Sequence, residues 1–183
     1  EGLRRISYER VREELNRILL SPRPSRGLQL MLEAGLMGIV LPELEACRGV
    51  DQNRFHAHDV LVHSLMATDA APADNLIVRL AALFHDIAKP QTREERDGDY
   101  TFYAHQVLGA RLAGRIMRRL AYSNEERERV EHLVYHHMFY YEPESGRIHP
   151  VEHDGNESLA PMDVSLSPVI GVANTNRPVL YRL

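Results

Sequence analysis

The sequence predicts an all-α fold, a bundle of six or seven helices followed by a loop-rich C-terminal tail. Apolar residues recur at helical spacing through most of residues 7–143, and no run alternates cleanly as a half-buried strand would. Prolines and helix-capping residues separate these apolar runs, which gives each predicted helix a start and an end. A chain of 183 residues is long enough for one domain with a sizeable core.

The first 54 residues predict two helices, a short apolar element and a loop. Ser7 can cap the first helix, because a serine hydroxyl accepts a hydrogen bond from a free backbone N–H of the first turn. Ser25 can cap the second helix in the same way, and Gly35 is expected just after its last turn. The short apolar element covers residues 36–40, and residues 47–54 are expected to form a loop.

Two apolar helices are predicted in the middle of the chain. The first covers about residues 58–71, and the second covers about residues 76–86, with Asp74 or Asn75 as its cap and Pro90 ending it. The second helix is apolar nearly all round, so it is expected to be the most buried element. Three side chains of the first helix are expected to face inward: Val62, Leu65 and Met66.

Two more helices are predicted further along the chain. Residues 93–99 indicate a charged turn, whose Asp-Gly pair can form a tight reversal. A helix is then expected over about residues 105–122. Ser123 and Glu126 have the spacing of a capping box, which is typical of a helix start, and that helix is expected to run to residue 137 or 138.

Composition and local character separate a helical part of the chain from an irregular tail (144–183) that has four prolines, three glycines and no helical period. No apolar run approaches the roughly 20 residues of a membrane span, so no membrane association is expected. The single cysteine excludes an internal disulfide framework and fits a reducing cytosol, so we expect a cytoplasmic protein. A net charge of −4 gives no general attraction to nucleic acid, so any RNA contact needs a local basic patch. The chain starts with neither a methionine nor a signal-peptide core, so we expect a trimmed chain or a segment of a longer protein.

The chemistry of the chain concentrates where the most apolar predicted helix ends. His85 and Asp86 stand side by side there, and Lys89 follows one helical turn later. An imidazole and a carboxylate are costly to bury without a partner that satisfies both, and a divalent metal is such a partner. His63 lies in the early part of the preceding helix. If the two helices are antiparallel and joined by a short linker, His63 and the His85-Asp86 pair can meet.

These residues resemble a known family. A histidine followed about 20 residues later by a His-Asp pair in an apolar helix is similar to the HD domain, a helical superfamily of metal-dependent phosphohydrolases. The chain is most similar to the HD region of bacterial tRNA nucleotidyltransferases of the poly(A) polymerase type, over roughly residues 2–143. Segments that carry the resemblance are Arg79-Leu-Ala-Ala-Leu-Phe-His-Asp-Ile-Ala-Lys-Pro, Gly35-Leu-Met-Gly-Ile-Val-Leu-Pro-Glu-Leu, Gly49-Val-Asp-Gln, Phe102-Tyr-Ala-His105 and His136-His-Met.

The resemblance implies a helical linker (1–54) followed by a core domain (55–143), an HD-domain-like helical bundle that holds a divalent metal (Mn, Ni, Co, Mg, Fe or Zn). It implies His63, His85 and Asp86 as metal ligands, with His105 and His136 or His137 holding a second metal or contacting phosphate. His85, Asp86 and Lys89 would be catalytic, with Lys89 neutralising a phosphate oxygen. The implied reaction is hydrolysis of a phosphomonoester or a 2′,3′-cyclic phosphodiester of a nucleotide or RNA end. The late aspartate that the family places on a further helix has no such counterpart, because only Asp154 and Asp163 follow, in polar surroundings.

A second reading gives the chain a binding role. Arg111, Arg115 and Arg118 form one stripe of a predicted helix, which is either a solvated face or a contact for an RNA backbone. The chain would then be a non-catalytic tRNA-binding or dimerisation module with a vestigial HD site. Its partners would be tRNA or a second copy of the chain, whereas the enzyme reading requires a nucleotide or another phosphoester substrate.

Overall fold

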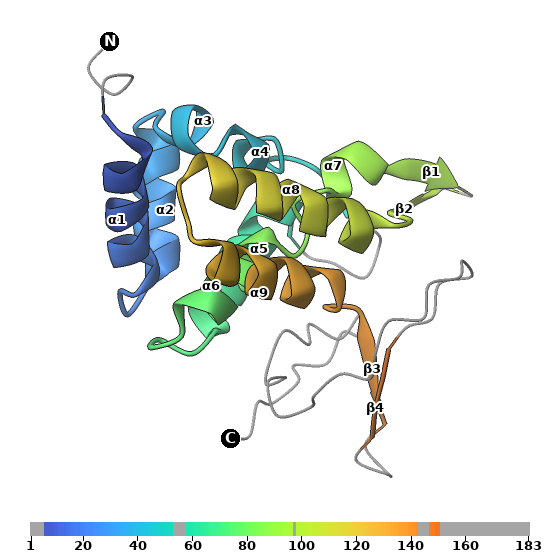
Figure 1. The fold of residues 1–183 in the computed structure, drawn as a ribbon. Helices are drawn as coiled ribbons and strands as arrows, with labels where there is room; N and C mark the ends of the chain where they lie inside the picture. Colours follow the sequence, from blue (N-terminus) through green and yellow to red (C-terminus); the bar gives the residue numbers. More distant parts are fainter. Residues whose placement is uncertain (1–5, 53–57, 97, 143–146, 151–183) are drawn as a thin grey trace.

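The computed structural model describes residues 6–52, 58–96, 98–142 and 147–150, and within these ranges the fold is mostly helical (Figure 1). The longer helices are α1 (Tyr8–Leu19), α2 (Pro24–Glu33), α5 (Val60–Ala70), α6 (Leu76–Phe84), α8 (His105–Arg119) and α9 (Asn124–Tyr135). Single-turn helices are α3 (Met37–Val40), α4 (Pro42–Glu45) and α7 (Lys89–Thr92). Two antiparallel hairpins pair β1 (Glu94–Arg96) with β2 (Asp99–Thr101) and β3 (Phe139–Glu142) with β4 (Arg147–Pro150). The predicted all-α fold is confirmed, with the hairpins as additions.

Helix starts follow the predicted capping residues in most cases. Ser7 caps α1, Asn75 caps α6, and Ser123 forms the full capping box of α9 with Glu126. The prediction for α2 is wrong, because this helix begins at Pro24 rather than after a serine cap. Ser25 instead lies in the first turn and donates from its backbone N–H and its hydroxyl to the carboxylate of Asp69 on α5, at 2.8 and 2.6 Å.

The inward face of α5 differs from the predicted one. Leu65 is buried as expected, but Val62 is 38% exposed and Met66 is 53% exposed. The side that faces the core carries Leu61, Ser64 and Leu65. This helix is apolar on both sides, so hydrophobic periodicity could not decide which side faces the core.

Helix α6 is the buried centre of the bundle, as predicted, and every residue from Val78 to Phe84 is buried. It contacts α1, α5, α8 and α9, so helices from both ends of the described chain surround it (Figure 1). Arg79 is the one charged side chain on this helix and is only 1% exposed. Its guanidinium donates to the carbonyl oxygens of Leu19, Ser21 and Ala71, so it satisfies carbonyl groups at the ends of α1 and α5.

Helix α6 ends before the position that the sequence predicts. It stops at Phe84, and residues 85–88 form turns closed by the bonds Ile87 N–H to Phe84 O (3.2 Å) and Lys89 N–H to Asp86 O (3.0 Å). Pro90 therefore does not end α6. It lies in the first turn of α7, where a helix tolerates proline because that turn lacks an internal acceptor for its N–H groups.

Both hairpins lie where the sequence indicated no strand. The charged turn over residues 93–99 is the β1–β2 hairpin, and Gly98 has a φ of +75° at its reversal. Helix α9 ends at Tyr135 rather than at residue 137 or 138, and β3 follows it. Strand β4 lies within the part predicted to be an irregular tail, while residues 151–183 of that tail fall outside the described residues. None of the helices in the described ranges has the length and apolar content needed to cross a membrane.

Candidate metal centre

His85 and Asp86 lie in the turn between α6 and α7, and each is only 2% exposed. The turn that follows α6 stays inside the bundle, since Ile87, Ala88 and Lys89 are buried as well. The bonds that close residues 85–88 each span three residues. Side chains three residues apart eclipse each other in such a turn, which places Lys89 beside Asp86.

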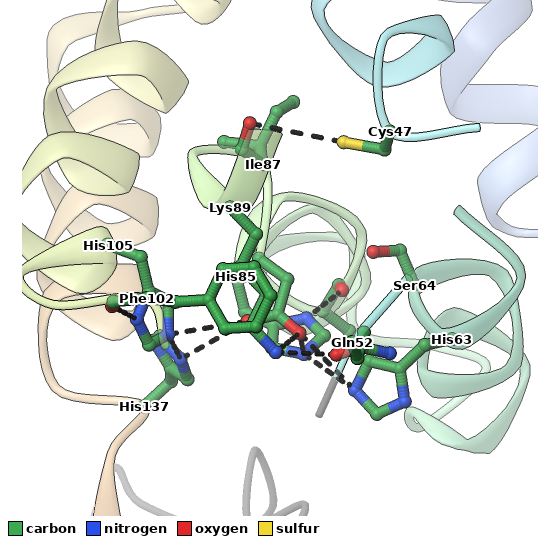
Figure 2. A network of polar contacts seen from close by, with 12 residues as sticks. Cys47, Gln52, His63, Ser64, His85, Ile87, Lys89, Phe102, His105 and His137 are labelled. Carbon is green, nitrogen blue, oxygen red and sulfur yellow. Dashed lines mark hydrogen bonds and ion pairs between the residues drawn. The ribbon is translucent and has the colours of Figure 1, made fainter. Parts of the chain in front are cut away.

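Four histidines surround the carboxylate of Asp86. Figure 2 labels their side chains, which come from four separate segments of the chain. Its Oδ2 lies 3.5 Å from Nε2 of His63 and 3.2 Å from Nε2 of His85. Its Oδ1 lies 3.4 Å from Nε2 of His105 and 3.7 Å from Nε2 of His137. Each carboxylate oxygen therefore faces one pair of imidazoles. Helix α5 and the turn after α6 supply the first pair, while α8 and the segment after α9 supply the second.

Three of these imidazoles are oriented by the protein backbone. In each, Nδ1 lies 2.7 Å from the carbonyl oxygen three residues earlier in the chain. A carbonyl can only accept, so Nδ1 carries the proton, and Nε2 of the neutral ring presents a lone pair to the cluster. The three pairs are His85 with Ala82, His105 with Phe102, and His137 with Val134.

This donor arrangement fits divalent metal ions. Nε2 of His63 and Nε2 of His85 are 3.1 Å apart, and the same distance separates Nε2 of His105 and Nε2 of His137. Two imidazoles bound to one metal at about 2.0–2.1 Å place their nitrogens roughly 2.9–3.4 Å apart. Two lone pairs at that distance repel each other unless a proton or a cation lies between them. Residues His63, His85 and Asp86 form one group with the separation of metal ligands, and Asp86, His105 and His137 form a second.

The electrostatics of the cluster favour an ionised Asp86 and a neutral His137. Burial alone would raise the pKa of Asp86, but His85 when protonated, the ammonium of Lys89, and the hydrogen bonds that His105 and His85 donate when Nε2 carries a proton hold that pKa well below its usual value. Burial, with the neighbouring His85 as a cation, lowers the pKa of His137 to about 3. Asp86 is therefore ionised and His137 neutral at physiological pH, which are the forms that bind a metal.

Other residues considered from the sequence lie elsewhere. His136 points away from the cluster, with its ring 4.5 Å from that of His132 and 4.9 Å from that of Tyr135. His58 is exposed at the start of α5. The three arginines of the predicted stripe, Arg111, Arg115 and Arg118, are exposed on α8. The late aspartates, Asp154 and Asp163, lie outside the described residues.

Sequence reasoning did not identify Gln52 and Phe102 as neighbours of Lys89. Its Nζ lies 2.7 Å from Oε1 of Gln52 and 2.8 Å from Oδ2 of Asp86. It also lies 5.2 Å from the ring centre of Phe102, within the range of a cation–π contact. Both residues stand in segments that carried the family resemblance, but no spacing rule connects them to the cluster.

Comparison with known proteins agrees with this geometry. Residues 55–167, more than half of the chain, match the family described as HD domain. The chain belongs to the HD-domain family. Residues 1–48 match a second family, described as the probable RNA and SrmB-binding site of polymerase A. This HD domain thus follows a region of the poly(A) polymerase type, and the resemblance that the sequence indicated is confirmed.

Several curated relatives are similar to this HD protein over about two thirds of its length or more. It is 42% identical over 136 residues to a CC-adding tRNA nucleotidyltransferase of Thermus thermophilus, covering 71% of this chain and 31% of that protein. It is 36% identical over 138 residues to an A-adding tRNA nucleotidyltransferase of Deinococcus radiodurans, covering 72% and 32%. A multifunctional CCA protein of Cupriavidus taiwanensis is 40% identical over 124 residues, covering 66% and 29%. The chain therefore spans about a third of the length of these relatives.

Proposed function

We propose that this HD domain is a metal-dependent phosphohydrolase that acts on phosphomonoesters or 2′,3′-cyclic phosphodiesters of nucleotides or RNA ends. One observation carries the proposal, the Asp86 carboxylate that faces an imidazole pair with each of its oxygens. A carboxylate shared in this way would hold two cations close together, which is the arrangement that two-metal phosphoester hydrolysis uses. The imidazole-rich donor set suits Mn, Fe, Co, Ni or Zn better than Mg, which prefers oxygen ligands.

Each side chain of the cluster has a distinct role in this proposal. His63 and His85 would hold one cation with Oδ2 of Asp86, and His105 and His137 would hold a second with Oδ1. Bound cations would lower the pKa of water and stabilise negative charge on phosphate oxygens. Lys89 brings a further positive charge to the edge of the cluster, where it can donate to a phosphate oxygen. The bonds from Nδ1 to backbone carbonyls keep three of the imidazoles aimed at the cluster before any ligand binds.

Metal analysis and hydrolysis assays on one set of variants test the proposal. The purified protein is expected to contain a transition metal, and to hydrolyse 2′,3′-cyclic AMP or p-nitrophenyl phosphate after a chelator is replaced by Mn²⁺, Ni²⁺ or Co²⁺. His85→Ala and Asp86→Asn are expected to lose about a hundredfold or more in rate, since even outer-shell partners of metal ligands contribute about 10–100-fold. His136→Ala, whose ring lies outside the cluster, is the matched control. A protein without metal that stays inactive with each added cation contradicts the proposal.

A non-catalytic role in binding tRNA, or in dimerisation, is the second candidate. It is supported by the match of residues 1–48 to a probable RNA-binding region and by the relatives named as tRNA nucleotidyltransferases. Arg111, Arg115 and Arg118 would contact the RNA backbone from the exposed face of α8. Three phosphate contacts give a slope of log affinity against log salt of about −2 to −3.

Changing these three arginines to glutamine should therefore weaken tRNA binding and flatten its salt dependence by about that slope. Arg129→Gln, at an exposed position of α9, is the control. Analytical ultracentrifugation of the same proteins reports dimerisation separately. Unchanged tRNA binding in the triple variant rules out this stripe as the contact.

A further inference from the structure

Gln52 contacts the cluster from outside both matched regions. It lies between residues 1–48, which match the RNA-binding family, and residues 55–167, which match the HD domain. It is nevertheless only 7% exposed, and its side chain belongs to the polar network drawn in Figure 2. Its Oε1 accepts from Nζ of Lys89 at 2.7 Å, and its Nε2 donates to the carbonyl oxygen of His58 at 3.1 Å.

The segment that carries Gln52 is fixed against the start of α5. Val60 N–H donates to the carbonyl of Val50 at 3.1 Å, and the carboxylate of Asp59 accepts from Gly49 N–H at 2.8 Å. The other oxygen of Asp59 caps α5 by accepting from Val62 N–H at 2.7 Å. One residue therefore sets both the first turn of the helix that carries His63 and the loop that carries Gln52. Both side chains reach the cluster from this one junction.

Lys89 is shared between Gln52 and Asp86. Its ammonium has three N–H donors, and two acceptors lie within hydrogen-bond distance, Oε1 of Gln52 at 2.7 Å and Oδ2 of Asp86 at 2.8 Å. The same Oδ2 faces the pair formed by His63 and His85. An ammonium that bonded Asp86 alone would compete fully with a cation for that oxygen. The amide oxygen of Gln52 attracts the ammonium from the other side, so the position of the ammonium is a balance between the two acceptors and its attraction to Oδ2 is weaker.

We propose that Gln52 is a positioning residue that acts through Lys89. Its amide oxygen holds the ammonium between itself and Asp86, which keeps Oδ2 available to a cation in the first imidazole pair and fixes Lys89 for contact with a substrate phosphate. The inference rests on the proposed function for the phosphate contact, whereas its effect on metal binding does not require catalysis. It also makes the centre depend on a residue of the predicted linker segment, outside the predicted core domain.

A double-mutant cycle read out as Mn²⁺ affinity by calorimetry tests the inference. Gln52→Met removes the amide oxygen at similar side-chain length, and we expect Mn²⁺ affinity to fall about three- to tenfold because Lys89 then bonds Asp86 alone. Lys89→Met removes the competing ammonium, and we expect affinity to rise. The double variant should match Lys89→Met within about twofold, because Gln52 has no effect without the lysine. Gln52→Asn, shorter by one methylene, should reproduce the loss and replaces Gln52→Met if that variant does not fold.

Two results would overturn the inference. One is that Gln52→Met lowers Mn²⁺ affinity by the same factor in the wild-type protein and in the Lys89→Met variant. The other is that Mn²⁺ affinity is unchanged in Gln52→Met or in its replacement Gln52→Asn. Tyr122→Phe removes a buried hydroxyl bonded to Asn16 at 2.5 Å, beyond the opposite end of α8 from His105, and should leave Mn²⁺ affinity unchanged. If wild-type protein binds Mn²⁺ with this coupling but hydrolyses no phosphoester, the proposed function fails and the positioning role stands. If hydrolysis occurs without the coupling, the positioning role fails and the proposed function stands.

Discussion

Two adjacent histidines, His136 and His137, offer a sharp test of the second imidazole pair. Only His137 faces Asp86, with Nε2 3.1 Å from Nε2 of His105, while His136 lies against His132. We expect His137→Ala to lose most of the stabilisation that a metal gives the fold, and His136→Ala to keep it. The two variants change the same residue type at neighbouring positions, so a general effect of losing a histidine is controlled.

The size of the effect follows from linkage between binding and unfolding. A cation at one hundred times its dissociation constant adds about 2.7 kcal/mol to the free energy of unfolding. If loss of His137 weakens binding by about 10–100-fold, the same cation concentration adds only about 0.4–1.4 kcal/mol. For a chain of this size, about 1 kcal/mol corresponds to about 2–4 °C in Tm. The Tm rise on adding metal should therefore fall from about 5–11 °C to below about 6 °C.

Thermal unfolding of the chelator-treated variants, with and without Mn²⁺, gives this measurement. Mn²⁺ is preferable to Ni²⁺ here, because His132 and His136 form an i, i+4 pair whose rings lie 4.5 Å apart and can chelate Ni²⁺. If the Tm rise on adding Mn²⁺ falls equally in His136→Ala and His137→Ala, or falls in neither, the assignment of His137 to the centre is refuted.

Further predictions concern three single residues. Asp86→Asn should weaken Mn²⁺ binding more than any single histidine change, because its carboxylate faces both imidazole pairs; calorimetry measures this. Burial and the charge of Asp86 raise the pKa of Cys47 from near 9 to about 12, so a thiol reagent at pH 8 should label it only after unfolding. The raised pKa also means that its contribution to stability is full below pH 9 and is lost as pH rises toward 12, which urea titrations at several pH values can follow. Arg79→Met should lower the free energy of unfolding by roughly 3 kcal/mol or more in urea denaturation, since each buried carbonyl left without a donor costs about 1–3 kcal/mol.

The longer helices could be predicted from the sequence because capping chemistry and periodicity act locally. The Ser123 and Glu126 spacing and the apolar run of α6 each determine an element with little help from distant residues. The short hairpins could not be predicted in this way. Three-residue strands such as β1 and β2 are too short to show an alternating pattern, and tertiary contacts decide their pairing. The prediction of which side of α5 faces the core was wrong for a related reason, since both sides of this helix are apolar.

More of the first imidazole pair than of the second could be predicted from the sequence. Spacing and antiparallel packing brought His63 to the His85-Asp86 pair, as the sequence indicated. The contribution of His105 came only from the family resemblance, and the choice between His136 and His137 stayed open. That choice depends on where α9 ends. Because it stops at Tyr135, the next residues leave the helical path, and Nδ1 of the second histidine bonds the carbonyl of Val134.

Where α6 gives way to the turns over residues 85–88, one carboxylate meets both imidazole pairs. The closing bonds of these turns span three residues, so the side chain of Lys89 lies in line with that of Asp86, with its Nζ 2.8 Å from Oδ2. The same Oδ2 lies 3.2 Å from Nε2 of His85. A buried carboxylate needs hydrogen-bond donors or cations at both oxygens. Lys89 contacts only Oδ2, so Oδ1 depends on His105 and His137, either as protonated rings or through a cation that they hold. Burial lowers the pKa of His137 to about 3, which disfavours a proton on that ring and favours a cation on that side of the carboxylate.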